Sequence, residues 1–251
     1  MIRLAIAAAV WLAAATQGFA EPPRLTVWAW ERPEDLRFLP TDVDIAVQSG
    51  FIVLAGDKMT SRSRRFPLFA NPQQVTTSVV HLQIDHRKPL DWTPQLRART
   101  AAAVVQLARS VDVRQVQIDF EVRASEHQIL RDVVTDVRAA LSPSTLLSMT
   151  ALASWCAHES WFDDLPVNEV VPMLFRMGPG GAQIRSVFAL GGDFPSAKCR
   201  KALAMSVDAP IVHAPADRRH YLFSPRSWTK GDFERVVRQI SSWSDPVGSP
   251  R

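Results

Sequence analysis

Two carboxylates, Asp119 and Glu121, end the stretch RQVQIDFE, residues 114–121. Neighbouring side chains of a strand point to opposite faces, so these acids share one face with Gln115 and Gln117, and the other face is apolar. Two carboxylates that approach closely do not both ionise easily, and a carboxyl group whose pKa is raised can donate a proton at neutral pH. The pattern therefore indicates acid catalysis, with Glu121 as the proton donor and Asp119 as the group that orients or tunes it.

These residues also have non-catalytic interpretations. Asp119 could be a structural acid bonded to polar neighbours, and Glu121 could be a substrate contact or a solvated rim residue. His81, in the middle of a similar strand, is more typical of a hydrogen-bonded interior histidine than of a base. A metal bound by His81, Asp85 and Asp119 is a further alternative, but the sequence has no H-E-x-x-H motif and no compact ligand spacing, so we expect no metal.

Tryptophans lie at or just beyond the ends of several predicted strands, together with further charged residues. Indole rings cover the apolar faces of sugar rings, and carboxylates accept hydrogen bonds from hydroxyl groups, so the combination favours a saccharide ligand. Each tryptophan could equally be packed in the core, and each charged residue could be an ordinary rim or ion-pair residue. The candidate contacts are Trp28, Trp30, Glu31, Asp85, Trp155, Arg176 and Trp228.

Eight strand-like segments supply the frame for these residues, and helical patterns separate several of them. Alternating strands and helices imply parallel pairing, and the roughly 230 residues available suit a (β/α)8 barrel. The alternative, an open doubly wound sheet, would usually carry a glycine-rich phosphate loop, and neither G-x-G-x-x-G nor G-x-x-x-x-G-K is present, so we expect no cofactor. The predicted strands span residues 25–30, 44–54, 76–85, 114–121, 146–154, 169–177, 204–207 and 220–224.

Three segments combine helical spacing of apolar residues with a serine or threonine that can cap the first turn. A short helix is expected over residues 33–39, and residues 44–54 and 59–69 predict a β-hairpin extension of the second strand with its turn at 56–58. The three capped helices are expected over residues 93–110, 125–141 and 229–243, with Thr93, Ser125 and Thr229 as their caps.

The N-terminal segment, residues 1–20, has the composition of a secretory signal peptide, and an uncleaved anchor is the alternative. No other apolar run approaches the ~20 residues that span a bilayer, so residues 21–251 should form one barrel domain in the bacterial periplasm or outside the cell. The formal charge of +4 is scattered rather than clustered, which argues against nucleic-acid binding. In an oxidising compartment Cys156 and Cys199 favour a disulfide, with two separate buried thiols as the alternative.

Six stretches of the chain carry a resemblance to a known family, at residues 28–33, 117–120, 147–152, 154–156, 169–178 and 221–224. Over nearly all of residues 21–251 the chain resembles a bacterial family of unknown function, the domain-of-unknown-function family numbered 3142. This resemblance implies no particular activity.

More distantly, QIDFE at residues 117–121 resembles the D-x-D-x-E signature of the chitinase-like glycoside hydrolases of family eighteen, and MLFR at 173–176 is similar to their M-x-Y-D. The resemblance implies a hydrolase barrel with Glu121 as the acid and Asp119 as its helper. Three positions depart from the pattern, so cleavage assisted by an acetamido group is not implied. They are Gln117 for an aspartate, Phe175 for the tyrosine and Arg176 for an aspartate.

Two functions are consistent with these residues. A glycosidase-like barrel predicts an open cleft at Glu121, tryptophan on its walls and a second carboxylate about 5 to 10 Å away, for which Asp85 or Glu31 would have to approach Glu121. A barrel that binds a saccharide or an envelope partner without cleaving it predicts that Arg176 holds Glu121, or that side chains fill the cleft.

Overall fold

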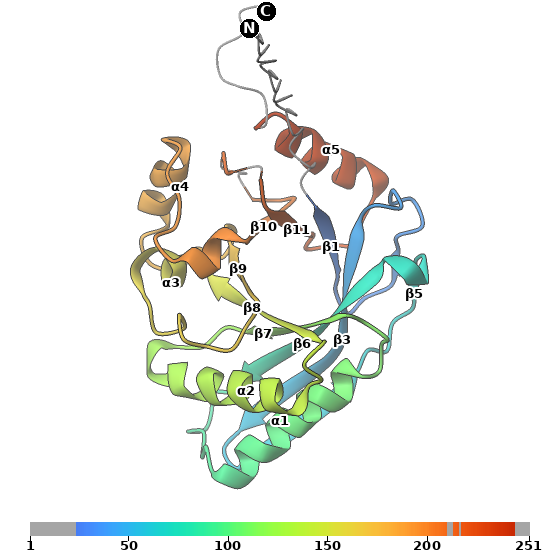
Figure 1. Cartoon of the computed structure of the whole chain (residues 1–251). Coiled ribbons are helices and arrows are strands. Elements are labelled where there is room, and N and C mark those ends of the chain that lie inside the picture. Colours follow the sequence, from blue (N-terminus) through green and yellow to red (C-terminus); the bar gives the residue numbers. More distant parts are fainter. Residues whose placement is uncertain (1–23, 210–212, 216, 244–251) are drawn as a thin grey trace, which may run out of the picture.

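The computed structural model describes residues 24–209, 213–215 and 217–243, so the predicted leader at residues 1–20 lies outside the described residues. Eight parallel strands close into a barrel, because the last strand pairs with the first and the first with the second (Figure 1). The predicted (β/α)8 fold in a single domain is confirmed. The strands are β1 (Leu25–Ala29), β3 (Asp44–Ala55), β6 (Val75–Ile84), β7 (Gln115–Phe120), β8 (Leu146–Leu152), β9 (Glu169–Met173), β10 (Ala202–Ser206) and β11 (Arg219–Phe223).

The helices cover the outside of the barrel unevenly. In Figure 1, α1 and α2 lie side by side below β3, β6 and β7, whereas α5 lies on the opposite side of the ring. Among the described residues, no α-helix follows β1 or β3. The helices are α1 (Pro94–Ala108), α2 (His127–Ala140), α3 (Ala153–His158), α4 (Gly181–Ala189) and α5 (Lys230–Ser241), with short 3-10 turns η1 (Pro72–Gln74), η2 (Ala124–Glu126) and η3 (Ala197–Arg200).

The predicted hairpin extends the second barrel strand. β4 (Lys58–Ser63) pairs antiparallel with the end of β3, and the turn contains Gly56, whose φ of +58° lies in the left-handed region that glycine adopts without strain. The predicted strand 59–69 was too long, because β4 ends at Ser63 and the chain forms a separate short strand, β5 (Leu68–Phe69).

The short helix predicted over residues 33–39 is wrong. This segment instead contains β2 (Glu34–Asp35), which pairs with β5; Glu34 N donates to the Pro67 carbonyl at 3.1 Å. The buried Glu34 carboxylate also accepts from the backbone N–H of Trp228 at 2.9 Å. Contacts with residues distant in sequence therefore hold the backbone extended.

Two of the three predicted caps are confirmed. Thr93 Oγ1 accepts from Leu96 N at 3.2 Å, and Thr229 Oγ1 accepts from Asp232 N at 3.1 Å. Ser125 does not cap α2, because it lies within η2 and α2 begins only at His127. The carboxylate of Glu126 accepts from Arg123 N at 2.8 Å, which satisfies a donor of this turn in place of a serine hydroxyl.

The side chains of β7 alternate between the outer core and the barrel lumen. Its apolar side chains pack in the outer core between strands and helices, whereas Gln115, Gln117 and Asp119 are buried and bond to side chains of other barrel strands. Gln115 Nε2 donates to the hydroxyl of Tyr221 at 3.0 Å, and this hydroxyl donates to Glu169 at 2.8 Å. The polar face of β7 therefore points into the lumen, as the sequence predicts.

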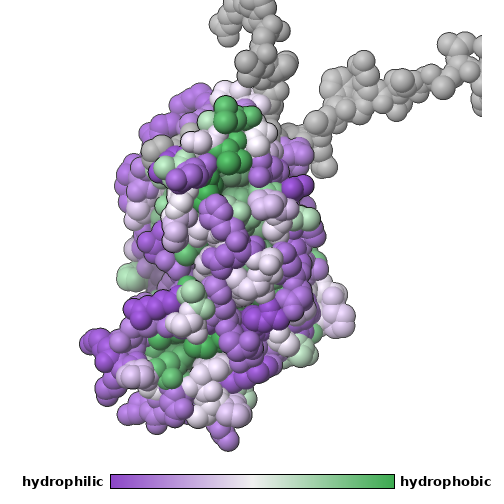
Figure 2. Space-filling view, turned by 90° about the vertical axis from the view of Figure 1, so that its left-hand side faces the viewer, coloured by the Kyte–Doolittle hydropathy of each residue, from purple (hydrophilic) through white to green (hydrophobic). Residues whose placement is uncertain are grey.

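The outer surface of the α3–α4 side is mainly hydrophilic, with small and separate apolar areas (Figure 2). The exposed large apolar side chains of the described residues include Leu190, just after α4. No helix in the described part of the chain has both the length and the apolar character needed to cross a bilayer.

Cys156 of α3 and Cys199 of η3 form the predicted disulfide, which joins residues 43 positions apart. Because a cross-link restricts mainly the unfolded chain, replacing both cysteines by alanine should lower the free energy of unfolding by about 2 to 4 kcal/mol. Urea unfolding followed by circular dichroism measures this difference. Equal stability of the variant and the parent under oxidising conditions would contradict the expected contribution of the bridge.

Candidate functional site

A cavity of about 300 Å³ lies within the C-terminal part of the barrel, and we call it the mouth cavity. The chain ends of parallel strands meet at this end, where (β/α)8 barrels place their reacting groups. The cavity brings together the predicted residues Asp119, Glu121, Trp28, Trp30 and Arg176. Its full lining is Trp28, Trp30, Val79, His81, Gln117, Asp119, Glu121, Thr150, Met173, Phe175, Arg176 and Phe223.

Aromatic side chains form one part of the cavity lining. Phe175 and Phe223 stack with ring centroids 5.1 Å apart, and Trp30 meets Phe223 edge-on at 5.7 Å. Trp28 lies deeper and is 3% exposed, and its Nε1 donates to Gln117 Oε1 at 2.8 Å. Trp30, Phe175 and Phe223 are less buried and therefore present apolar surface of the kind that covers a sugar ring. Trp28 is fixed inside the lumen by its hydrogen bond to Gln117.

His81, Asp119 and Thr150 form the principal polar cluster of the cavity. The pairing of β6 with β7 sets His81 directly beside Asp119, and their Nδ1 and Oδ2 atoms are 2.6 Å apart. Thr150 Oγ1 on β8 donates to the other carboxylate oxygen, Oδ1, at 2.7 Å. Both oxygens of Asp119 are therefore occupied.

The pKa of Asp119 lies below its ordinary value. Burial by itself raises this pKa, but the hydrogen bonds from His81 and Thr150 and the electrostatic attraction of the His81 and Arg176 side chains lower it by more. Asp119 is therefore a carboxylate at neutral pH and not a proton donor.

Glu121 lies just beyond β7 at the rim of the cavity. Its Oε2 is 3.3 Å from a guanidinium nitrogen of Arg176, and the two side chains are 43% and 63% exposed. An ion pair this exposed contributes only about 0 to 1 kcal/mol, so an incoming ligand can separate it. His81, Glu121 and Arg176 also line an adjoining hollow of about 430 Å³, which places Glu121 where two hollows meet.

Asp85 and Glu31 lie outside the mouth cavity. Hydrogen bonds from Arg87 lower the pKa of Asp85 to about 2. Glu31 forms an ion pair with Arg62. Neither acid lines the cavity together with Glu121. Among the described residues no group of three or more His, Cys, Asp or Glu side chains could hold a metal ion.

Trp155 and Trp228 also lie outside the cavity. Trp155 is buried at the start of α3, where it packs against Trp161 with centroids 5.2 Å apart. Trp228 is buried behind β1, and its Nε1 donates to the carbonyl of Trp28 at 2.9 Å. Both are therefore placed as core residues that support neighbouring elements.

Phe223, Phe175 and Thr150 line the cavity without having been selected as ligand contacts. Phe223 shares the inward face of β11 with Tyr221, and Thr150 shares that of β8 with Ser148. Strand alternation could have identified both, because each follows an inward residue by two positions. Phe175 follows Met173 by the same interval beyond the end of β9.

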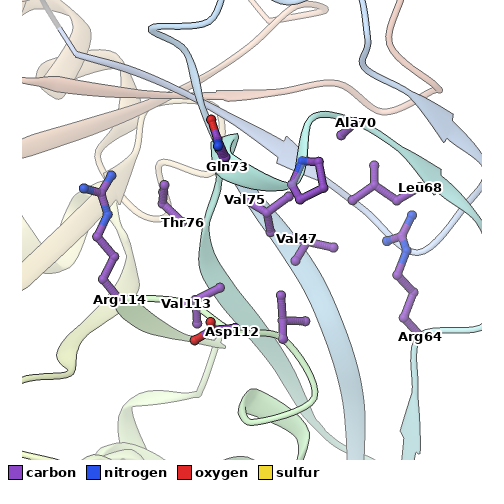
Figure 3. Close-up of a pocket in the computed structure, with 12 residues that line it drawn as sticks. Val47, Arg64, Leu68, Ala70, Gln73, Val75, Thr76, Asp112, Val113 and Arg114 are labelled. Atoms are coloured by element: carbon purple, nitrogen blue, oxygen red, sulfur yellow. The ribbon is translucent and has the colours of Figure 1, made fainter.

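A larger hollow of about 960 Å³ lies away from the barrel mouth (Figure 3). Val47, Val75 and Val113 lie along it, and Arg64 and Arg114 stand at its opposite ends in Figure 3. The guanidinium of Arg64 already donates to the carbonyls of Trp30 and Arg32 at 2.6 and 2.7 Å. This hollow lacks converging reactive groups, so the mouth cavity is the better candidate despite its smaller volume.

The similarity of this chain to known proteins is remote. No family model and no curated protein matches the sequence, so the resemblance to the family numbered 3142 stays a prediction. A fungal endo-β-N-acetylglucosaminidase of glycosyl hydrolase family 18 matches 89% of this chain and 87% of its own, with 10% identity and a TM-score of 0.46. The chitinase domain of the spore coat protein CotE from Clostridium difficile matches 96% and 69%, with 12% identity and a TM-score of 0.41. At this level of similarity the two proteins assign no function to the chain.

Replacing Asp119 by asparagine should destabilise the barrel at neutral pH by about 1 to 3 kcal/mol, because it disturbs a buried hydrogen-bond network. A carboxylate with a depressed pKa stabilises the fold above its unfolded pKa of about 3.9, and this contribution is lost as pH falls through the folded pKa. The difference between parent and variant should therefore shrink at acidic pH. Urea unfolding from about pH 6 to pH 3 tests this, and a constant difference would contradict it.

Proposed function

We propose that the barrel binds a saccharide in the mouth cavity and hydrolyses it, with Glu121 as the general acid. The observation that carries this proposal is the arrangement of the cavity, where Trp30 and Phe223 offer apolar faces and Asp119 and Glu121 offer carboxylates. Sugars need both kinds of surface, because their rings have apolar faces and their hydroxyls are hydrogen-bond donors.

The placement of the two acids supports separate roles. Glu121 is accessible at the rim, where it can reach the oxygen that links two sugars, and the exposed Arg176 is its replaceable partner. Asp119 is a fixed negative charge deeper in the cavity, which would stabilise the positive charge that develops on the sugar ring during bond cleavage. Asp119 thus serves as the modulator of the reaction.

A second candidate function is saccharide binding without cleavage. The ion pair between Glu121 and Arg176 favours it, and so does the position of Glu31 and Asp85, because neither supplies a second carboxylate beside Glu121. The same aromatic and polar surfaces would then serve recognition alone.

The chain's proposed location is outside the cytoplasm, in the periplasm or beyond the cell. The disulfide between Cys156 and Cys199 supports this, because such bridges persist in oxidising compartments. The secretory composition of residues 1–20 agrees with it. Cell-wall and exported glycans are therefore the natural ligands to test.

Glu121→Gln should strongly slow the turnover of a hydrolysed glycan while leaving its dissociation constant within a few-fold of the parent value. The amide keeps the shape of the side chain but cannot donate an acidic proton, and loss of a general acid costs about 10²- to 10⁴-fold in rate. The experiment incubates the parent and the variant with cell-wall and exported glycans, measures products by chromatography and measures binding by calorimetry.

Glu234→Gln is the matched control, because Glu234 lies on α5 and pairs with Lys230 away from the cavity. Binding by the parent without products would establish the second candidate function. Absence of both binding and products for every glycan would reject the saccharide proposal.

Trp30→Ala should weaken saccharide binding by about tenfold or more, because it removes the ring face that a sugar would cover. Trp161→Phe is the control, because Trp161 packs against Trp155 outside the cavity. Calorimetric titration of both variants with the glycan bound by the parent measures the effect. Unchanged affinity of Trp30→Ala would place the sugar elsewhere.

A further inference from the structure

Hydrolysis needs a second reacting group besides the acid, and the predicted carboxylates do not provide it. Glu31 is paired with Arg62 and Asp85 with Arg87, outside the mouth cavity. Asp119 has both oxygens engaged by His81 and Thr150. The remaining titratable side chain that lines the cavity beside Asp119 is His81.

We propose that His81 is the general base of this site, oriented by Asp119, and that it removes a proton from the water that attacks the saccharide. This inference rests on the proposed hydrolysis and assigns the group that activates the nucleophile. It gives a catalytic role to a histidine whose strand position alone is typical of an interior structural residue.

The hydrogen bonds define which nitrogen of His81 is free. Asp119 Oδ2, 2.6 Å away, accepts a hydrogen bond from Nδ1–H, because an ionised carboxylate has no proton to donate. The neutral ring then carries a lone pair on Nε2. Nε2 has no hydrogen-bond partner among the described residues. It is also not among their fully buried side-chain atoms, so its lone pair is open to solvent. A base with an accessible lone pair therefore lines the cavity.

Packing holds the imidazole in this orientation. Phe51 stacks on the ring at a centroid distance of 5.0 Å and an angle of 16°, and Trp30 meets it edge-on at 5.9 Å. Arg62 lies over the Phe51 ring at 5.1 Å. Glu121 and Arg176 line both hollows, and His86 and Arg123 also line the adjoining one.

The proposed step balances in atoms and charge. Water oxygen forms a bond to the anomeric carbon while one water proton moves to His81 Nε2. The bond from that carbon to the linking oxygen breaks, and the proton of Glu121 moves to the leaving oxygen. The resulting imidazolium faces the Asp119 carboxylate, as in other carboxylate–histidine pairs. Exchange of protons with solvent restores both groups.

The two roles predict different responses to a leaving group that needs no proton. The probes are 2,4-dinitrophenyl glycosides of the gluco, galacto, manno and N-acetylglucosamine series, used with the full chain. Glu121→Gln should lose far less rate with a dinitrophenyl glycoside that the parent cleaves than with a glycan, because dinitrophenolate leaves unprotonated. His81→Gln should lose about 10²- to 10⁴-fold in kcat with little change in KM, because water still needs a base.

Sodium azide provides a second readout, because it attacks without losing a proton. It should restore dinitrophenolate release by His81→Gln and yield a glycosyl azide, which a variant damaged only in its fold would not form. His158→Gln is the control, since His158 is exposed at the end of α3 and lies outside both hollows. It should match the parent.

The outcomes separate this inference from the proposed function. Cleavage by the parent together with parental kcat for His81→Gln overturns the role of His81 and leaves the hydrolase proposal standing. A slow His81→Gln variant that azide fails to restore also overturns it. If the parent cleaves neither a glycoside nor a glycan, the proposed hydrolysis fails and the base role fails with it.

Discussion

The inner face of a closed parallel barrel offers little water, so each inward polar group must find its partner among other inward side chains. This constraint explains the lumen of the protein. Gln115 bonds Tyr221, Gln117 bonds Trp28, and Asp119 bonds His81 and Thr150. The partners come from β1, β6, β8 and β11, so the polar network links strands around the ring. Asp119, His81 and Thr150 belong to this network and also line the mouth cavity.

Asp119 and Glu121 differ in burial, because Asp119 lies inside the barrel lumen and Glu121 lies at its rim. Asp119 is 8% exposed, and its hydrogen bonds outweigh the cost of burying its charge. Glu121 lies one strand repeat further along, with a solvated partner and an open surface around it. The carboxylate of Asp119 is therefore held in place, whereas the side chain of Glu121 can change its partner. This difference supports separate roles for two residues that look equivalent in the sequence.

The frame and the centre of the candidate site follow from patterns that act over short distances. Alternation along residues 114–121 predicts which side chains enter the lumen, because a strand repeats every two residues. The same reasoning identifies Trp28 on β1 and Trp30 just after it as inward residues. Local patterns failed where distant contacts decide, as at residues 33–39, which pair with β5 instead of forming a helix.

The order of residues along the chain was enough to specify a barrel with a wet interior, two acids at its mouth and a pair of cysteines that could meet. It did not specify which acids would be left free, because ion pairing depends on side chains that folding brings together. Arg87 forms an ion pair with Asp85, and Arg62 forms one with Glu31. Asp119 bonds to His81 across the β6–β7 pair. Strand register and closure of the ring decide these contacts, since they determine which distant residues come within hydrogen-bonding distance.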